Sequence, residues 1–328
     1  MNILLTGGTG FFGKALIREF LATELVNETN LTIVSRNPAQ FEKNYPDLLD
    51  IKSIRIVKGN IENINSLPND KRYSHIIHAA TDSTLGPQLN PIVRYKQIVK
   101  GTSNLLEFAV TNKAERFLLT SSGGIYGPQP DEIDFISEDY LGSPLLTEVS
   151  AAYSHGKRAA EHLCALYSES FGIDFTIARC FTFVGRDLPF NVHFAIGNLM
   201  NDALYNSDIV IKGDGTPIRS YLDQRDLAKW LWTLLFEGKN GEIYNVGSDR
   251  AISILELAHT IRRLLSPNKA IVIKGRNNPI SYRNRYIPDI SKINRELSLA
   301  PEYNLEEAIL EAVKYRLNKN GGIKGNGQ

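Results

Sequence analysis

Short apolar runs alternate with longer amphipathic stretches through the first half of the chain. The apolar runs at residues 2–6, 30–35, 53–59, 75–80, 116–122 and 174–180 predict strands. Apolar residues recur at helical spacing over 11–25, 101–112 and 154–172. Because regular strand–helix alternation with apolar strands requires helices on both faces of a parallel sheet, we predict an α/β, doubly wound parallel sheet.

The alternation is less regular after residue 180. The pattern there predicts helices at 193–205, 223–237, 253–265 and 304–317, and a buried strand at 241–248. We therefore expect a first domain at 1–180, with 241–248 returning to its sheet, and a smaller C-terminal α/β lobe at 181–317. The polar, glycine-rich residues 318–328 predict a disordered tail.

Composition narrows the class of protein. Of the 328 residues, 42% are hydrophobic and 22% are charged, and the net charge is +1, which gives no electrostatic reason to expect nucleic acid or an anionic membrane surface as a partner. No apolar stretch approaches the roughly 18 residues of a membrane span, and no basic-then-apolar leader opens the chain. Two cysteines, Cys164 and Cys180, predict buried thiols. We expect a cytoplasmic protein.

A glycine-rich loop follows the first strand and opens the first helix. Gly7, Gly10 and Gly13 are spaced three apart, and in this strand–helix context the spacing predicts a dinucleotide site in a Rossmann domain. Side chains at these positions would obstruct the turn, the pyrophosphate and the helix–sheet contact, respectively. Phe11 and Phe12 start the helix whose N–H groups face the phosphates. The alternative is a tight turn that binds nothing.

The end of the second strand bears on which dinucleotide binds. A carboxylate there would accept from the ribose 2′-hydroxyl of NAD, but the chain has Ser35 and Arg36. Because a guanidinium attracts a 2′-phosphate, we predict NADP(H), with NAD(H) possible if Arg36 is only a solvated loop charge. Asn60 and Ile61, after the third strand, are expected near the adenine.

Tyr153 and Lys157 lie four residues apart at the start of a predicted helix, hence on one face. An ammonium group in this position can lower the pKa of the phenol and hold a cofactor ribose, which a tyrosine needs in order to exchange protons near neutral pH. Ser122 ends a strand at the carboxyl edge of the sheet, where its hydroxyl could donate to a substrate oxygen. We predict these three as catalytic residues.

Together these segments resemble the extended short-chain dehydrogenase/reductases, the nucleotide-sugar epimerase/dehydratase family. The resemblance spans nearly the whole chain and comprises, in the family's order, "TGGTGFFG", "HAAT", "SSGGIYG", "YSHGK", "GDGTPIRSYLDQRDLA" and "YNVGS". It implies an NAD(P)-dependent enzyme acting on a nucleotide sugar. It also implies that Ser122, Tyr153 and Lys157 are catalytic, and that Ala79 and Ala80 of "HAAT" lie against the coenzyme.

The resemblance assigns a substrate site as well. Arg219 falls on the family's arginine for the nucleotide phosphates, and Arg285 is the nearest match to a later phosphate-binding arginine. His193 lies in the segment that lines the sugar site, and Gly123 adjoins Ser122. The alternatives are surface charges for the arginines, and a contact with the nucleotide or the core for the histidine.

The family commonly dimerises through two helices per subunit, which implies a homodimer through 101–112 and the helix from Tyr153. Leu105, Leu106, Phe108, Leu163, Leu166 and Tyr167 would permit this contact and would equally suit packing against the sheet.

Departures from the family pattern carry information about the reaction. The family's dehydratases have two acidic residues after the Ser/Thr, and its decarboxylases have glutamate at the second position, whereas this chain has Gly123 and Gly124. Elimination and decarboxylation are therefore disfavoured. Ile98 stands where the family often has asparagine. We expect NADPH-dependent reduction of a nucleotide-linked 4-keto-6-deoxyhexose; the alternatives are an NAD(P)-dependent nucleotide-sugar 4-epimerase and a non-catalytic dinucleotide-binding protein.

Overall fold

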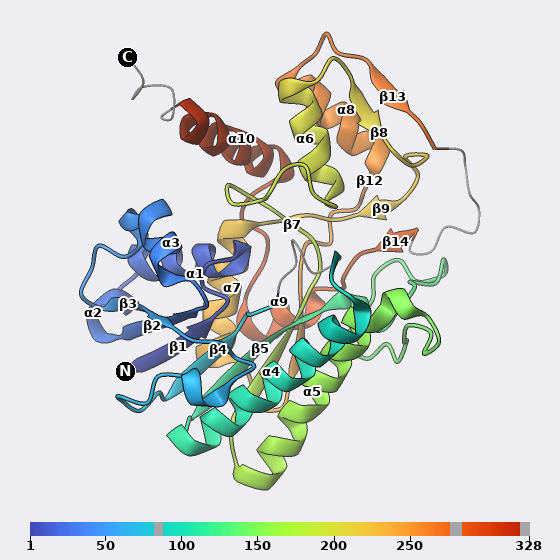
Figure 1. Cartoon of the computed structure of the whole chain (residues 1–328). Coiled ribbons are helices and arrows are strands. Elements are labelled where there is room, and N and C mark those ends of the chain that lie inside the picture. Colours follow the sequence, from blue (N-terminus) through green and yellow to red (C-terminus); the bar gives the residue numbers. More distant parts are fainter. Residues whose placement is uncertain (82–87, 276–283, 322–328) are drawn as a thin grey trace.

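The computed structural model describes residues 1–81, 88–275 and 284–321, and its largest sheet has seven strands (Figure 1). All of the pairings in this sheet are parallel, and the order is β11-β6-β5-β4-β1-β2-β3. The strands are β1 (Asn2–Thr6), β2 (Asn30–Ser35), β3 (Ile54–Lys58), β4 (His75–His78), β5 (Arg116–Ser122), β6 (Asp174–Cys180) and β11 (Ile243–Val246). The predicted doubly wound parallel sheet is confirmed.

Helices cover both faces of this sheet. The helices of the chain are α1 (Phe11–Ala22), α2 (Leu25–Glu28), α3 (Pro38–Asn44), α4 (Pro91–Asn112), α5 (Ala152–Phe171), α6 (Ala195–Tyr205), α7 (Gln224–Glu237), α8 (Ile254–Leu265), α9 (Ser291–Leu297) and α10 (Leu305–Gly321). In β1, Ile3 and Leu5 pack with α1 and α7, whereas Leu4 packs with α4 and α5. A strand buried on both sides needs apolar residues at every position, which explains the continuous apolar runs.

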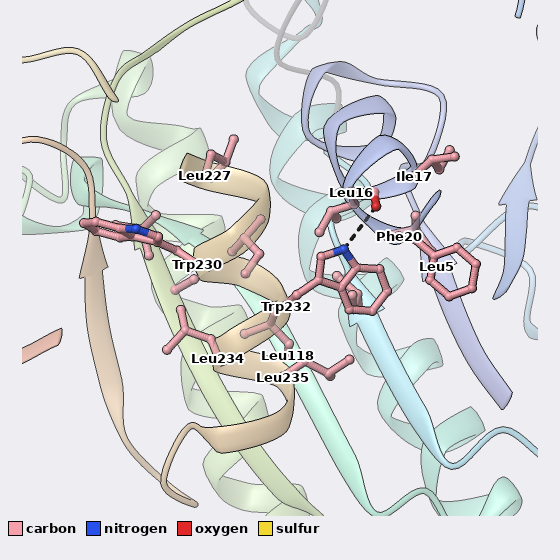
Figure 2. Packing of buried hydrophobic residues seen from close by; sticks show 14 of the residues in the cluster. Leu5, Leu16, Ile17, Phe20, Leu118, Leu227, Trp230, Trp232, Leu234 and Leu235 are labelled. Carbon is pink, nitrogen blue, oxygen red and sulfur yellow. Dashed lines mark hydrogen bonds between the residues drawn. The ribbon is translucent and has the colours of Figure 1, made fainter. Parts of the chain in front are cut away.

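The core between the sheet and α7 is built around two tryptophans (Figure 2). Trp230 and Trp232 are both buried, and the Trp232 Nε1 donates to the Leu16 carbonyl of α1 at 3.0 Å. This hydrogen bond satisfies the indole N–H inside an apolar cluster and joins two helices that are far apart in the sequence. α1, which follows the glycine-rich loop, is therefore held against α7.

The strand order creates a crevice at the carboxyl edge of the sheet. β1 lies between β2 and β4, so the chain leaves β1 toward one side of the sheet and later returns on the other side. The strand order reverses at this point, and ligands of doubly wound folds bind at such a reversal. The glycine-rich loop and the "HAAT" segment follow these two strands.

Beyond residue 180 the chain adds small sheets and a further apolar cluster. The additional strands are β7 (Phe183–Val184), β8 (Ile209–Ile211), β9 (Ile218–Arg219), β10 (Leu222–Asp223), β12 (Ile252–Ser253), β13 (Ile271–Ile273) and β14 (Arg285–Tyr286). α6, α8 and α10 share a core of their own that includes Met200, Leu257 and Ile309. By contrast, α7, α9 and β11 pack with the main sheet, since β11 pairs with β6 and the helices before and after it cover the same face.

Several elements differ from the sequence-based expectations. The helix expected at 101–112 begins ten residues earlier, at Pro91, after the N-cap Asn90. α3 was not predicted; Asn37 caps it by accepting from the Gln40 N–H, and Pro38 occupies its first turn. The tail expected from residue 318 is corrected at its start, because α10 continues to Gly321 and the Lys319 ammonium donates to the Tyr45 hydroxyl. The remainder of that tail, 322–328, lies outside the described residues.

Two further expectations concern burial. Cys164 and Cys180 are buried free thiols, as predicted. Leu105, Leu106 and Phe108 are buried within the core of a single chain, so they pack against the sheet, whereas Leu166 is about half exposed on α5. No helix in the described part of the chain is long and apolar enough to cross a bilayer.

Candidate active site

A cavity of about 1120 Å³ extends along the carboxyl edge of the sheet and into the part of the chain beyond residue 180. It brings together most of the predicted site residues. Those predicted for the coenzyme and found on its wall are Gly7, Gly10, Phe11, Phe12, Ser35, Arg36, Asn60, Ile61, Ala79 and Ala80. Ser122, Tyr153, Lys157, His193 and Arg219 also line it, whereas Gly13, Gly123 and Arg285 do not.

The glycine-rich loop is shaped by backbone-to-backbone contact. Gly7 has φ of +77°, and a Cβ added there would lie 2.4 Å from the Ala79 carbonyl oxygen. A Cβ at Gly13 would lie 2.2 Å from the Gly8 Cα, so the start of α1 rests directly on the loop. Gly10 is on the cavity wall and caps α1. These residues leave backbone and space where a pyrophosphate would bind, and they fit a dinucleotide.

The second strand ends in a short polar stretch beside the cavity. Ser35 is nearly buried, and its hydroxyl accepts from the Asn37 N–H at 3.2 Å. Arg36 is exposed and lines the cavity. Asn37 is committed to capping α3, so Arg36 is the charged group that this loop presents to a ligand.

The catalytic candidates lie at the end of β5, which holds Ser122, and at the start of α5, which holds Tyr153 and Lys157. The Ser122 hydroxyl accepts from the Gly124 N–H at 3.1 Å, which turns the chain at the end of β5. The Lys157 ammonium donates to the Thr120 carbonyl at 2.7 Å and lies 6.0 Å from the centre of the Tyr153 ring. Burial lowers the pKa of Lys157 to about 8, although Cys180 and Glu161 oppose the shift. Lys157 thus remains largely protonated near neutral pH while being poised to lose its proton.

Arg94 is a site residue that sequence reasoning missed. Its guanidinium lies over the Tyr153 ring, 4.3 Å from the ring centre, and it lines the cavity. Burial, followed by the positive charge of Arg94, lowers the pKa of His193. Arg94 stands in the first turn of α4, which was expected to start ten residues later. The Asn–Pro pair at 90–91 was the signal for the earlier start, because asparagine favours the N-cap and proline the first helical position.

A buried polar network lies behind the catalytic candidates and joins three strand ends. The Ser121 hydroxyl donates to Glu161, which also forms an ion pair with Arg179 at 2.8 Å. Arg179 donates to the Tyr126 hydroxyl at 2.9 Å, and Tyr126 in turn donates to Asn245 at 2.9 Å. These contacts tie β5, β6 and β11 together beside Ser122, so the hydroxyl is carried by a fixed strand end.

Only some of the residues predicted to bind the substrate lie on the cavity wall. Arg219, in β9, donates to the Ile218 carbonyl at 2.7 Å and reaches the cavity wall. Arg285, in β14, forms an ion pair with Asp134 at 2.6 Å and is not on that wall. A Cβ at Gly123 would lie 2.7 Å from the Phe181 ring and from the Tyr286 hydroxyl, so Phe181 takes the place on the wall beside Ser122.

Sequence comparison places this geometry in a family. The model of the NAD dependent epimerase/dehydratase family matches residues 3–247. The chain belongs to this family. An NAD(P)-dependent enzyme of the extended short-chain dehydrogenase/reductase type, as predicted, is therefore confirmed at the level of the family.

Individual relatives of the family perform different reactions. UDP-glucuronic acid decarboxylase 3 of Arabidopsis thaliana is 30% identical over 327 residues, covering 98% of this chain and 90% of that protein. The dTDP-glucose 4,6-dehydratase of Escherichia coli is 28% identical over 359 residues, covering 99% and 95%. Sequence similarity alone thus gives the family without selecting one of its reactions.

Solved structures of the family share the fold. UDP-glucose 4-epimerase from Thermotoga maritima, solved with UDP-glucose, matches with a TM-score of 0.83 at 21% identity, covering 98% of this chain and all of that one. UDP-glucuronic acid 4-epimerase from Bacillus cereus, solved with UDP-glucuronic acid and NAD, matches with a TM-score of 0.82 at 23% identity, covering 96% and 98%.

Within the family fold, the cavity of this chain contains few acidic groups. Among the described residues that line it, Glu62 is the single carboxylate, and it follows Asn60 and Ile61 at the end expected to hold adenine. Gly123 and Gly124 are both buried beside Ser122 and carry no side chain. The wall near Ser122 and Tyr153 therefore offers hydroxyl, ammonium and guanidinium groups to a substrate.

Proposed function

We propose that this chain is an NADPH-dependent reductase that transfers a hydride to C4 of a nucleotide-linked 4-keto-6-deoxyhexose. One observation carries the proposal: Ser122, Tyr153 and Lys157 share a cavity with the glycine-rich loop, and the described wall beside them has no carboxylate. The named relatives act on sugars linked to UDP or dTDP, which supports a nucleotide sugar as the substrate class.

The residues present suit carbonyl reduction. Bound NADPH would supply the hydride to the carbonyl carbon. Tyr153 would donate its phenolic proton to the oxygen that becomes a hydroxyl, and Ser122 would donate a hydrogen bond to the same oxygen. Lys157, held by the Thr120 carbonyl, would favour the phenolate that remains until a proton from solvent replaces the one donated.

Elimination and decarboxylation need further proton transfers for which the wall beside Ser122 offers no carboxylate. An acidic side chain at position 123 would also collide with Phe181 and Tyr286. The Phe181 ring instead supplies an apolar surface beside Ser122, which suits a C6 methyl group better than a charged C6 carboxylate. Arg219 is the candidate for the nucleotide diphosphate.

The choice of NADP(H) over NAD(H) rests on the end of β2. Ser35 and Arg36 occupy the position where a carboxylate would select NAD, and Arg36 is exposed toward the cavity. A reductase consumes its coenzyme in each turnover, which agrees with a freely exchanging NADPH. We further propose a homodimer that uses the outer surfaces of α4 and α5.

A nucleotide-sugar 4-epimerase is the second candidate, and the fold similarity to two solved 4-epimerases favours it. An epimerase oxidises and then reduces the same sugar carbon, so it shows no net use of coenzyme.

The deciding experiment mixes the purified protein and NADPH with UDP-, dTDP- and GDP-linked 4-keto-6-deoxyhexoses and follows the nicotinamide absorbance. We expect one mole of NADPH to be oxidised for each mole of reduced sugar, identified by mass and NMR. Parallel samples contain UDP-glucose without added coenzyme. Conversion of UDP-glucose to its C4 epimer there, with no NADPH oxidation in the first arm, would contradict the reductase and favour the epimerase.

A further inference from the structure

At the end of the cavity beside α3, Arg36 lies on the wall and two further cationic side chains reach a residue of the wall, Tyr45. Gln40, Asn44 and Tyr45 line the cavity here, next to Arg36. The C-terminal end of α10 reaches Tyr45, the residue that follows α3, although the two helices are at opposite ends of the chain (Figure 1). Its Lys319 donates to the Tyr45 hydroxyl at 3.0 Å.

A second ammonium group reaches the same hydroxyl. Lys14, in α1, donates to the Tyr45 oxygen at 3.2 Å. Its ammonium lies 4.8 Å from the centre of the Tyr45 ring, and that of Lys319 lies 4.2 Å from it. A phenol oxygen that accepts from two ammonium groups still has its own O–H to donate. Tyr45 therefore presents a hydroxyl donor that is backed by two positive charges.

The negative charge near Tyr45 does not balance the positive charge of the side chains around it. Lys14 forms an ion pair with Asp187 at 3.1 Å, and Arg18 binds the same buried carboxylate. Among the described residues that contact Tyr45 or Asp187, Lys14, Arg18 and Lys319 thus contribute three positive charges against the one carboxylate of Asp187, an excess of two. Arg186 adds no net charge, because it pairs with Glu311 at 2.9 Å.

The titration of Tyr45 reflects this surplus. Burial acts to raise its pKa, but the hydrogen bonds and charges of Lys319 and Lys14 outweigh that effect, and the pKa of Tyr45 is lowered. Cations that share one neutral hydroxyl repel each other at short range, and an anion placed against Tyr45 would relieve the repulsion. A phosphate monoester has the charge and the acceptor oxygens for this position.

We propose that Tyr45, backed by Lys14 and Lys319, forms a phosphate-binding site at this end of the cavity. The proposal rests on the proposed function for its ligand, because the phosphate that the cavity can supply is the 2′-phosphate of NADP(H). Arg36, which follows β2 and also lines the cavity, would approach the same phosphate from the β2 side. The last helix of the chain thereby becomes part of the coenzyme site.

The test compares adenosine 2′,5′-bisphosphate with adenosine 5′-phosphate, which differ only in the 2′-phosphate. Calorimetry gives Kd for both ligands with the wild-type protein, Lys319→Met, Tyr45→Phe and the control Lys314→Met, which removes an exposed lysine of the same helix. We expect Lys319→Met and Tyr45→Phe to weaken the bisphosphate by about tenfold, as for loss of one charge-assisted hydrogen bond. Binding of the 5′-phosphate and both Kd values of the control should stay unchanged.

Two results would overturn the site: equal weakening of both nucleotides, which would indicate that Lys319 only holds α10 in place, or no weakening of either. Tyr45→Phe keeps the ring, so it separates the hydroxyl from the packing. Wild type could prefer the bisphosphate while Lys319→Met and Tyr45→Phe bind it as tightly as wild type does. That result would refute the site at Tyr45, and the preference for NADPH would then be assigned to Arg36.

The last part of the test measures the binding of inorganic phosphate to wild type and to Lys319→Met. If wild type binds both nucleotides equally but binds phosphate, and Lys319→Met abolishes that binding, the site stands with a separate anion as its ligand and the NADPH preference fails. If wild type neither distinguishes the nucleotides nor binds phosphate, both the site and the preference are wrong.

Discussion

Lys157 carries a positive charge in a position that water barely reaches. It is 2% exposed and its ammonium donates to the Thr120 carbonyl. Burying a charged ammonium opposes folding, because the group loses its contact with water. The absence of water also strengthens the electrostatic interaction by which the ammonium lowers the pKa of a neighbouring phenol. Arg94 adds a second cation against Tyr153. Two cations therefore lie beside the Tyr153 ring, and the charge of the more buried one, Lys157, opposes folding.

Replacing Tyr153 by phenylalanine removes the hydroxyl and keeps the ring beside Arg94 and Lys157. We expect turnover with the keto-sugar substrate to fall by about two to four orders of magnitude, the range for losing general acid catalysis. NADPH binding should stay within about twofold of wild type, measured by fluorescence titration. Tyr167→Phe, on the same helix, is the matched control and should turn over normally. Near-normal turnover by Tyr153→Phe would refute the role.

Replacing Lys157 by methionine should stabilise the fold near pH 7 while abolishing activity. A fall in pKa from 10.5 to about 8 corresponds to a penalty of about 3 kcal/mol on the charged form, and loss of the hydrogen bond to Thr120 offsets about 1 kcal/mol of the gain. The folded protein loses this proton as the pH rises through about 8, so the penalty disappears between there and the ordinary pKa.

Urea unfolding at pH 7 and again above pH 9 measures the difference in the free energy of unfolding between Lys157→Met and wild type. The advantage of Lys157→Met over wild type should shrink at the higher pH, and the exposed-residue control Lys96→Met should change little at either. A methionine variant that is less stable than wild type at pH 7 would contradict the cost assigned to the buried charge.

At the scale of elements, the site depends on how closely α1 approaches the loop that precedes it. Gly13 allows α1 to rest on Gly8, and Gly7 allows the loop to pass the backbone of Ala79. Close packing also joins α4 to α5, because Ile98 of α4 lies against Gly156 of α5. In the sequence, Gly156 lies between Tyr153 and Lys157. Ile98 therefore helps to set the position of α5 through apolar packing.

Gly13→Ala should separate α1 from the loop. The new Cβ meets backbone atoms of Gly8 and Gly7 at 2.2 and 2.4 Å, and neither can move without shifting the helix. We expect a loss of about 1–3 kcal/mol in the free energy of unfolding, together with weaker NADPH binding. Gly213→Ala is the control, because no neighbour lies within 4 Å of its added Cβ. Wild-type stability and affinity in Gly13→Ala would show that the loop can relax.

At the scale of the whole molecule, Asp187 links the sheet domain to the residues that follow it. Its buried carboxylate receives Lys14 and Arg18 from α1 and the Gln224 amide from α7. Gln224 also donates to the Phe11 carbonyl at 2.8 Å. This cluster lies at the start of α1, so the contact between the two parts of the chain also supports the glycine-rich loop.

Asp187→Asn keeps the shape of this side chain and removes its charge. Because Lys14 and Arg18 would lose their shared carboxylate, we expect the free energy of unfolding near pH 7 to fall by about 3 kcal/mol. The pKa of Asp187 is lowered, against the effect of burial, by Arg18 and Lys14. Its stabilisation is therefore present above the ordinary pKa of 3.8 and is lost as the pH falls below that value.

Thermal unfolding at pH 7 and below pH 4 tests this contribution. The gap between wild type and Asp187→Asn should narrow at the lower pH, while the exposed-carboxylate control Asp131→Asn should unfold like wild type at pH 7. A gap that is the same at both values would mean that the stabilisation does not depend on the charge of Asp187.

Local spacing along the chain was enough to predict the parallel sheet, the glycine-rich loop and the catalytic candidates. Apolar runs marked β1, β2, β5 and β6 to the residue, and a four-residue interval placed Tyr153 and Lys157 on one helix face. Three contacts became visible only in the folded chain. Arg94 lies over Tyr153. Phe181 lies on the cavity wall beside Gly123, and Lys319 and Lys14 both reach Tyr45. Such contacts join residues far apart in the sequence, so their partners are fixed by packing and charge in three dimensions and leave no periodic signal along the chain.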